Sequence, residues 1–324
     1  MRARLDWAGA TSALTGADSV VVCAHVDPDG DAIGSVLAAT LALRSLGVAA
    51  VPTLADAATV PSTYAFLPGC DMFVPASEIP APDVFLALDT PTPARLGMAQ
   101  GLVDGARLIV VADHHPDNRR FGDVELFDPR AAATGQIIWR LLRHLGVEPS
   151  PDMARCLYVA LMTDTGRFSY GNTNPRALRD AANMVIAGAD PYAAYDATYE
   201  NRTPGSLRLL GLALSRVTLA NDGRVAYSWV SEADLADTGT TMPETENLVD
   251  AVRQLGGIDA VFLAKVVGGN VRISLRSKRG ADVGAVARLL GGGGHAAAAG
   301  ATVEGDLTAA LAALLPLLPG GASR

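Results

Sequence analysis

Short apolar runs alternate with helical patterns through the first half of the chain. The apolar runs cover 19–24, 49–54, 84–88 and 108–112, and the most regular helical pattern covers 31–46. This alternation is typical of a parallel sheet covered by helices. We therefore predict an α/β fold for this half.

From about residue 131 helical patterns dominate. Prolines lie near several of the predicted starts, where the missing N–H of proline costs nothing. The predicted helices cover 135–145, 151–162, 175–187, 191–199 and 204–219.

A smaller α/β pattern follows, with predicted strands at 224–230, 259–267 and 270–277 and predicted helices at 244–255 and 283–290. We place the connection between the two parts within 190–215. The chain is accordingly divided into an N-terminal domain (1–195), a connecting helix or linker (196–215) and a C-terminal domain (216–324).

Composition narrows the class of protein. The 324 residues are 49% hydrophobic and carry a formal net charge of −8, which argues against a broad basic surface that tracks along long nucleic acid. No apolar stretch approaches the roughly 18 residues of a membrane span, and the first residues lack the apolar core of a signal peptide. We expect a cytoplasmic protein whose three cysteines, Cys23, Cys70 and Cys156, are buried thiols without metal-type spacing.

Three predicted strands end in side chains that can bind metal. His25 follows the first strand, Asp89 the third and Asp113 the fourth. Ligands in open α/β sheets bind beyond the carboxyl ends of the strands, so these residues are expected to meet there. Carboxylates and imidazoles without thiolates suit Mn²⁺, Mg²⁺ or Fe²⁺ better than structural zinc.

The segment from His25 to Asp31 holds alternating candidate ligands, including Asp27 and Asp29. Pro28 and Gly30 make a straight strand improbable, so we predict a turn into a helix that begins near Asp31. The alternative is a capped helix start with a solvated acidic turn.

The triplet Asp113, His114 and His115 places two imidazoles in different directions, so that one can bind metal while the other faces a substrate. Ordinary surface imidazoles in a loop are the alternative. Asp89 and Asp164 could each be only a turn former or a helix cap. Asp89 and Asp164 become strong candidates for metal ligands because all of the metal-type segments occur together in this chain.

Apolar and polar positions alternate along 270–277, which predicts a strand with one basic face. That face carries Arg276, with Lys278 in phase just beyond. Solvated charges on a half-exposed strand are the alternative. Arg167 and Phe168, near Asp164, are candidates for contacts with a phosphate and a base, although Phe168 could equally be core.

A glycine run near the end of the chain lets backbone approach a ligand closely, and exposed amides there could hold phosphate. A flexible turn is the alternative. The run consists of Gly291, Gly292, Gly293 and Gly294 and is followed by His295. The fifth histidine, His144, is expected at the surface near a helix end.

As a set, the metal-type segments resemble the DHH phosphoesterase superfamily, and the glycine run with His295 resembles the DHHA1 domain that accompanies it. Within that superfamily the chain resembles the group of nanoRNases and 3′-phosphoadenosine 5′-phosphate (PAP) phosphatases, over nearly its whole length. The resemblance implies an α/β protein with an N-terminal parallel-sheet DHH domain wrapped by helices and a smaller C-terminal α/β DHHA1 domain.

The resemblance also implies two divalent cations, Mn²⁺ first, with Mg²⁺ or Fe²⁺ as alternatives. It assigns His25 and Asp29 to one cation, Asp31, His114 and Asp164 to the other, and Asp89 to both. His115 is then expected to face the substrate phosphate and Asp113 to orient His114. Arg276 and His295 are implied as substrate contacts, with Gly292, Gly293, Gly294, Lys278 and Arg167 as further candidates.

The activity implied is the hydrolysis of short oligoribonucleotides (nanoRNA) to mononucleotides and of PAP to AMP and phosphate. One alternative is a linear or cyclic dinucleotide phosphodiesterase, acting on pApA or c-di-AMP, and another is a non-catalytic nucleotide-binding sensor. A manganese pyrophosphatase would share the metal ligands but carries a different second domain. We expect no membrane partner and no long duplex nucleic acid, and leave open a homodimer.

Overall fold

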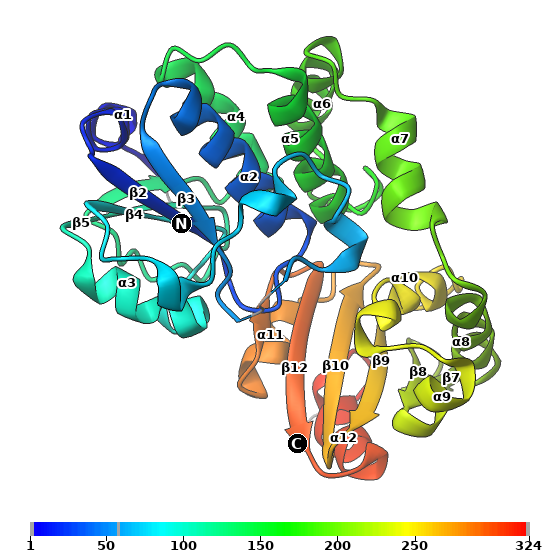
Figure 1. Cartoon of the computed structure of the whole chain (residues 1–324). Helices are drawn as coiled ribbons and strands as arrows, with labels where there is room; N and C mark the ends of the chain where they lie inside the picture. Colours follow the sequence, from blue (N-terminus) through cyan, green and yellow to red (C-terminus); the bar gives the residue numbers. More distant parts are fainter. Residues whose placement is uncertain (1–2, 57–58, 322–324) are drawn as a thin grey trace. The chain divides into compact units, whose positions relative to one another are not determined.

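The computed structural model describes residues 3–56 and 59–321 of the chain. The chain divides into two compact units, 1–201 and 202–324, each with its own sheet (Figure 1). The two units are described separately below.

The sheet of the first unit has the strand order β1-β6-β5-β4-β2-β3. Neighbouring strands are parallel except at the edge, where β1 pairs antiparallel with β6. Its strands are β1 (Arg4–Leu5), β2 (Ser19–Cys23), β3 (Ala49–Thr53), β4 (Val84–Leu88), β5 (Leu108–Asp113) and β6 (Val124–Phe127).

The helices of this unit are α1 (Trp7–Thr15), α2 (Gly30–Ser45), α3 (Gln100–Gly105), α4 (Thr134–His144), α5 (Pro151–Asp164), α6 (Pro175–Ile186) and α7 (Pro191–Tyr195). In Figure 1, α2, α4 and α5 lie together at one face of the sheet and α3 at the other. A π-helical turn, Asp196–Glu200, follows α7.

Alternate residues of each central strand enter two different cores. In β4, Leu86 packs into the core shared with α2, α4 and α5, whereas Phe85 and Ala87 pack into the smaller core beside α3. All five residues of β4 are buried. A strand buried on both faces is what a near-continuous apolar run predicts, so the expected covered parallel sheet is confirmed.

The central strands confirm the predicted pattern closely, since the run 84–88 is β4 residue for residue. Among the strands and α-helices of the described residues of this unit, β1, α1, α3 and β6 were not predicted. The strand β6 is only four residues long and contains Glu125, which is buried, so its apolar signal is weak.

The second unit holds a mixed sheet with the strand order β11-β12-β10-β9-β8-β7, in which only the β8 and β9 pair is parallel. Its strands are β7 (Thr218–Ala220), β8 (Val225–Ser231), β9 (Ala260–Val267), β10 (Asn270–Ser277), β11 (Gly293–Gly294) and β12 (Ala298–Glu304). Its helices are α8 (Pro204–Ser215), α9 (Glu232–Thr238), α10 (Leu248–Val252), α11 (Val283–Leu289) and α12 (Leu307–Leu314).

Two predicted helices of this unit are wrong in extent. The helix predicted at 204–219 ends at Ser215, and β7 follows because Thr218–Ala220 pairs with β8. The helix predicted at 244–255 contains only α10, because Asn247 has a positive φ of 64° and separates α10 from a preceding 3-10 turn. The smaller α/β unit itself is confirmed.

Cys23 and Cys156 are fully buried and Cys70 is half-buried, and none forms a disulfide. Burial raises the pKa of the Cys23 and Cys156 thiols. No helix in the described part of the chain is both long and apolar enough to cross a membrane.

Candidate metal centre

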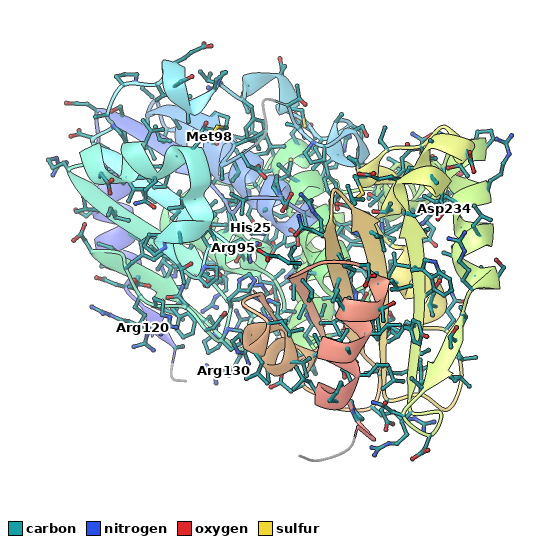
Figure 2. All side chains as sticks on the ribbon, turned by 90° about the horizontal axis from the view of Figure 1, so that it is seen from below. His25, Arg95, Met98, Arg120, Arg130 and Asp234 are labelled. Carbon is teal, nitrogen blue, oxygen red and sulfur yellow. The ribbon has the colours of Figure 1, made fainter. Side chains whose placement is uncertain are left out.

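The carboxyl ends of β2, β4 and β5 bring the predicted metal-type residues together. These strands are aligned in parallel register, with Cys23 beside Ala87 and Leu88 beside Ala112. His25 and Asp89 follow β2 and β4, and Asp113 is the last residue of β5. Figure 2 shows His25 inside the N-terminal unit. The three side chains are buried.

Three groups of side chains in this unit could each hold a metal ion. The ligand atoms of each group lie within 4.8 Å of one another. The groups are His25, Asp29 and Asp89; Asp31, His114 and Asp164; and Asp89, Asp113 and His115. The first two correspond to the two ligand sets that the family resemblance implies, and Asp89 lies beside both.

His114 occupies the middle of the second group. Its Nε2 lies 3.5 Å from Asp89 Oδ1, 3.7 Å from Asp31 Oδ2 and 3.4 Å from Asp164 Oδ2. One N–H cannot donate to three acceptors, and all three distances exceed a good hydrogen bond. Ligand atoms about 2.1 Å from one cation are themselves about 3.0–3.5 Å apart, so this spacing fits a shared divalent ion.

Asp164 gives independent support for a cation. Its Oδ2 is buried and accepts no hydrogen bond among the described residues. Such an atom costs about 1–3 kcal/mol unless an ion or water satisfies it. The donor set of carboxylates and imidazoles therefore fits a divalent cation.

Backbone carbonyls fix the orientation of two histidines. Nδ1 of His25 lies 2.7 Å from the carbonyl oxygen of Val26, and Nδ1 of His114 lies 3.1 Å from that of Ala131. If each Nδ1 carries the proton for its carbonyl, each Nε2 is left with a lone pair. This is the usual arrangement around a metal-binding histidine.

The start of α4 holds Asp31. The backbone N–H groups of Thr134 and Gly135 donate to its two oxygens at 2.6 and 2.8 Å, and the Thr134 hydroxyl donates to Asp89 at 2.9 Å. Gly135 permits this approach, because a Cβ there would lie 2.7 Å from that of Ala160. The positive end of the helix dipole also favours the carboxylate.

Asp29 is both a helix cap and a candidate metal ligand, the two roles considered for its segment. It is the N-cap of α2, since its Oδ1 accepts hydrogen bonds from the N–H groups of Asp31 and Ala32 at 3.0 Å each. It also belongs to the group with His25 and Asp89. Asp27 has a positive φ of 51° and donates its N–H to Asp56, so its backbone has a structural role.

Without a cation, the pKa values of several side chains in the cluster differ strongly from their ordinary values. Burial raises the pKa of Asp31 well above its ordinary value, aided by the charge of Asp89, and burial raises the pKa of Asp164 to about 7. Burial lowers the pKa of His114, but the charge of Asp164 and the contacts with Asp89 outweigh it, so that this pKa is raised well above its usual range. The cluster therefore retains protons that a cation would replace.

His115 is held by Asp113. Its Nδ1 lies 2.8 Å from Asp113 Oδ1, and Asn118 donates to the other carboxylate oxygen at 2.5 Å. Asp113 is fully buried. We expected Asp113 to orient His114; its carboxylate accepts hydrogen bonds from His115 and Asn118. Burial lowers the pKa of His115, yet the charges of Asp113 and Asp89 leave it raised.

In the second unit, Arg276 lies on the polar face of β10, and its Nε donates to Asp250 at 3.2 Å. Lys278 donates to the backbone carbonyls of Arg253, at 2.9 Å, and Leu255. The predicted alternation is confirmed, because Val271, Ile273 and Leu275 are buried.

The last two glycines of the run, Gly293 and Gly294, form β11. A Cβ on Gly292 would lie 2.1 Å from the carbonyl oxygen of Gly300, and one on Gly294 would lie 2.7 Å from that of Ala298. Close packing on β12 thus accounts for both glycines, while Gly293 pairs with Gly300. The N–H of His295 donates to the Ala298 carbonyl at 2.8 Å.

Arg167 stacks over the ring of Tyr199, with 4.9 Å between its guanidinium carbon and the ring centroid. Phe168 packs against the main core of the first unit, which was the alternative considered for it. His144 is exposed, as expected, and stacks on Trp7 with the ring centroids 4.5 Å apart.

Several residues of the centre were missed by sequence reasoning. Thr134 and Gly135 act through backbone N–H groups, for which residue type gives no signal. Asn118 lies in a loop and Arg95 in the short 3-10 helix Pro93–Ala99, neither of which has a periodic pattern. Arg95 Nη2 lies 3.1 Å from His25 Nδ1. The predicted helix beginning at 135 was the one available pointer, because helix N-termini attract anions.

Family models match both parts of the chain. Residues 19–161 match the N-terminal domain of the DHH family, and residues 222–318 match the DHHA1 domain. The bifunctional oligoribonuclease and PAP phosphatase NrnA of Thermus thermophilus is 36% identical over 288 residues, which cover 88% of this chain and 84% of that protein. The protein of the same name from Bacillus subtilis is 27% identical, with 88% and 90% covered.

A solved structure has the same fold. The exopolyphosphatase-related protein from Bacteroides fragilis superposes with a TM-score of 0.85 at 24% identity, covering 95% of this chain and 93% of that one. Three findings indicate the same family: the order of the two domains, the converging ligand groups and the 36% identity. The chain belongs to the DHH family of phosphoesterases, in which a DHHA1 domain follows the DHH domain.

Proposed function

We propose that this protein hydrolyses short oligoribonucleotides to mononucleotides and PAP to AMP and phosphate. The observation that carries the proposal is the position of His114 Nε2 within 3.4–3.7 Å of three aspartate carboxylates. Such a site suits a metal-dependent phosphoesterase, and the names of the two NrnA relatives supply the substrate class. Cytoplasmic nucleotides are the proposed substrates.

The proposed cofactor is a pair of divalent cations, with Mn²⁺ as the first choice. His25 and Asp29 would hold one ion, Asp31, His114 and Asp164 the other, and Asp89 both. When bound, two such cations lower the pKa of a water towards neutrality and neutralise charge that builds on the phosphoryl oxygens.

Residues of the chain itself orient the proposed ligands and provide a group, His115, that can hold or donate a proton. Asp113 holds Nδ1 of His115 and fixes the direction of the ring, so that the opposite nitrogen, Nε2, would contact a phosphoryl oxygen or the leaving oxygen. Thr134 and Gly135 keep Asp31 in place through the start of α4. This division of labour predicts that His115→Ala lowers turnover greatly while bound metal is retained.

The second unit, 202–324, is the proposed substrate-binding domain. Arg276 is the main candidate for a phosphate contact, since Asp250 holds its Nε and directs the rest of the guanidinium. His295 and the glycine run are the other candidates. Lys278, which donates to two backbone carbonyls, and Arg167, which stacks over Tyr199 in the first unit, are further candidates.

A dinucleotide phosphodiesterase remains the second candidate, because its substrates carry the same phosphodiester chemistry. The test is a product assay with Mn²⁺ on pApA, PAP, cyclic diadenylate and pyrophosphate in parallel. Release of mononucleotide from pApA and phosphate from PAP supports the proposal. Activity on pyrophosphate alone would overturn it.

A matched pair of variants separates catalysis from nucleotide sensing. Asp89→Asn should abolish hydrolysis because Asp89 lies beside both candidate ion sites. Asp259→Asn changes a carboxylate of the second unit paired with the exposed Arg224 and should leave hydrolysis unchanged. A sensor would show no hydrolysis in the wild-type protein and equal nucleotide binding in both variants.

A further inference from the structure

Arg95 lies directly against a candidate metal ligand. It belongs to the segment Pro93–Ala99, which follows β4 and Asp89. Its Nη2 lies 3.1 Å from Nδ1 of His25 and 3.5 Å from the carbonyl oxygen of Val26. Figure 2 labels Arg95 next to His25. The side chain is half-buried. A permanently charged guanidinium therefore stands at the edge of the cluster.

The backbone on either side of Arg95 is fixed. Its carbonyl oxygen accepts a hydrogen bond from the N–H of Val26 at 2.8 Å, and Leu96 is fully buried in the core beside α3. Gly97 has a positive φ of 46°, and a Cβ there would lie 2.5 Å from the carbonyl oxygen of Ala55. These contacts therefore fix the position of the Arg95 backbone.

The guanidinium of Arg95 has one distant acceptor, the Val26 carbonyl oxygen, 3.5 Å from Nη2. When Nδ1 of His25 carries the proton for Val26, Arg95 faces another donor at that nitrogen. Arg95 forms no ion pair within the ranges 3–56 and 59–321, although Asp29 and Asp89 lie by the same imidazole. A half-buried guanidinium fork without a carboxylate is suited to bind an anion from outside the chain.

We propose that Arg95 binds a phosphate oxygen of the substrate. The inference rests on the proposed function, which supplies an anion at this edge of the sheet. Guanidinium pairs with phosphate through two parallel N–H donors, which adds orientation to charge. PAP offers two such groups, the 3′-phosphate that is cleaved and the 5′-phosphate that is retained, and the two are chemically alike.

The test compares the wild-type protein with Arg95→Gln and Arg95→Lys. Binding of PAP to metal-free protein is measured by calorimetry, and kcat/KM is measured with Mn²⁺ on PAP and on adenosine 3′-monophosphate. We expect Arg95→Gln to weaken PAP binding and kcat/KM by about 10- to 100-fold, the usual effect of losing a hydrogen bond to a charged group. Arg95→Lys, which keeps the charge but loses the fork, should lie between.

The two substrates identify the phosphate. An equal loss on both indicates the cleaved 3′-phosphate, and a loss confined to PAP indicates the 5′-phosphate, which adenosine 3′-monophosphate lacks. Arg143→Gln is the matched control, because Arg143 is exposed in the last turn of α4 and should leave all values unchanged.

The metal content of each variant, measured by mass spectrometry, separates binding from positioning. The inference is overturned if Arg95→Gln binds PAP as tightly as the wild-type protein, or if lost metal accounts for the whole kinetic effect. In that second case Arg95 only positions His25. Failure of the proposed function is a different result, because the wild-type protein would then hydrolyse neither substrate while the metal-free comparison still tests Arg95.

Discussion

Hydrogen-bond partners fix the orientation of single side chains at this centre. Asp113 offers one oxygen to Nδ1 of His115 and the other to the amide of Asn118. In Asp113→Asn, the new NH₂ group must face one of these two donors. We expect kcat to fall by about 10- to 100-fold, as for other groups that orient a site residue. Bound metal, measured by mass spectrometry, should not change.

A double variant provides the control. In Asp113→Asn with Asn118→Asp, the donor and acceptor are exchanged, so the amide at 113 can donate to 118 and accept from His115. Recovery of most of the lost kcat is expected. If the exchange recovers nothing, or if the single variant loses its metal, Asp113 acts on metal binding instead.

Residue type was enough to find the side chains that carry chemistry, but not those that hold them. Histidine and aspartate at successive strand ends stand out as a set, although each aspartate alone could be a turn former or a helix cap. The N–H groups of Thr134 and Gly135 do not stand out, since every residue except proline has one. Asp89 also has a positive φ of 53°, a strained conformation that no local pattern announces.

Elements were predictable where one pattern fills the whole segment. β4 and β10 follow this rule, because the first is continuously apolar and the second alternates. β6 and β12 were missed since pairing with a neighbouring strand, rather than their own apolar residues, defines them. The over-long helix at 204–219 shows the same effect, because pairing with β8 converts its end to β7.

The contact of α2 with α5 determines the distance between Asp31 and Asp164, which these helices carry. Gly34 permits it, since a Cβ there would lie 2.3 Å from the carbonyl oxygen of Cys156. We expect Gly34→Ala to lower the free energy of unfolding by about 1–3 kcal/mol, the usual cost of overpacking. Urea denaturation measures this change.

Gly101→Ala is the matched control for that variant. Gly101 lies in α3 of the same unit, and a Cβ there would meet nothing within 4 Å. Alanine in an open helical position should leave stability unchanged or raise it by about 0.5–1 kcal/mol. No loss of stability in Gly34→Ala would mean that the α2 and α5 contact tolerates a methyl group.

One ion pair joins α8 to α9 in the second unit. Arg216 donates to both oxygens of Asp234, at 2.6 and 2.7 Å. This pairing lowers the pKa of Asp234 to about 2 from an ordinary 3.8. A lowered carboxyl pKa stabilises the folded state fully above about pH 4, and the contribution disappears as the pH falls through about 2.

The wild-type protein should therefore exceed Asp234→Asn in stability by about 2 kcal/mol at pH 7, and the difference should vanish near pH 2. Chemical denaturation at several pH values measures both. Asp259→Asn is the comparison, because its partner Arg224 is 54% exposed and such surface pairs contribute about 0–1 kcal/mol. A difference between wild type and Asp234→Asn that is constant from pH 7 to 2 would contradict this account.

At the scale of the whole molecule, the metal-type residues belong to one unit. All eight ligand and orienting residues lie before residue 201, and the second unit has separate cores. Fold class was predictable at this scale, because each half of the chain has its own pattern. The centre joins segments more than a hundred residues apart, such as Asp31 and Gly135, and local pattern contains no such pairing.

Metal binding should therefore stabilise one unit selectively. Without cations the carboxylates of Asp31 and Asp164 resist ionisation, so the cluster is poorly satisfied when folded. An ion that binds only the folded state adds about 2.7 kcal/mol at a concentration a hundred times its Kd. Hydrogen exchange with and without Mn²⁺ should show slower exchange in α2, α4 and α5 and no change in β9, β10 and β12. Asp89→Asn should remove the effect, and equal slowing in both units would show that the ion binds elsewhere.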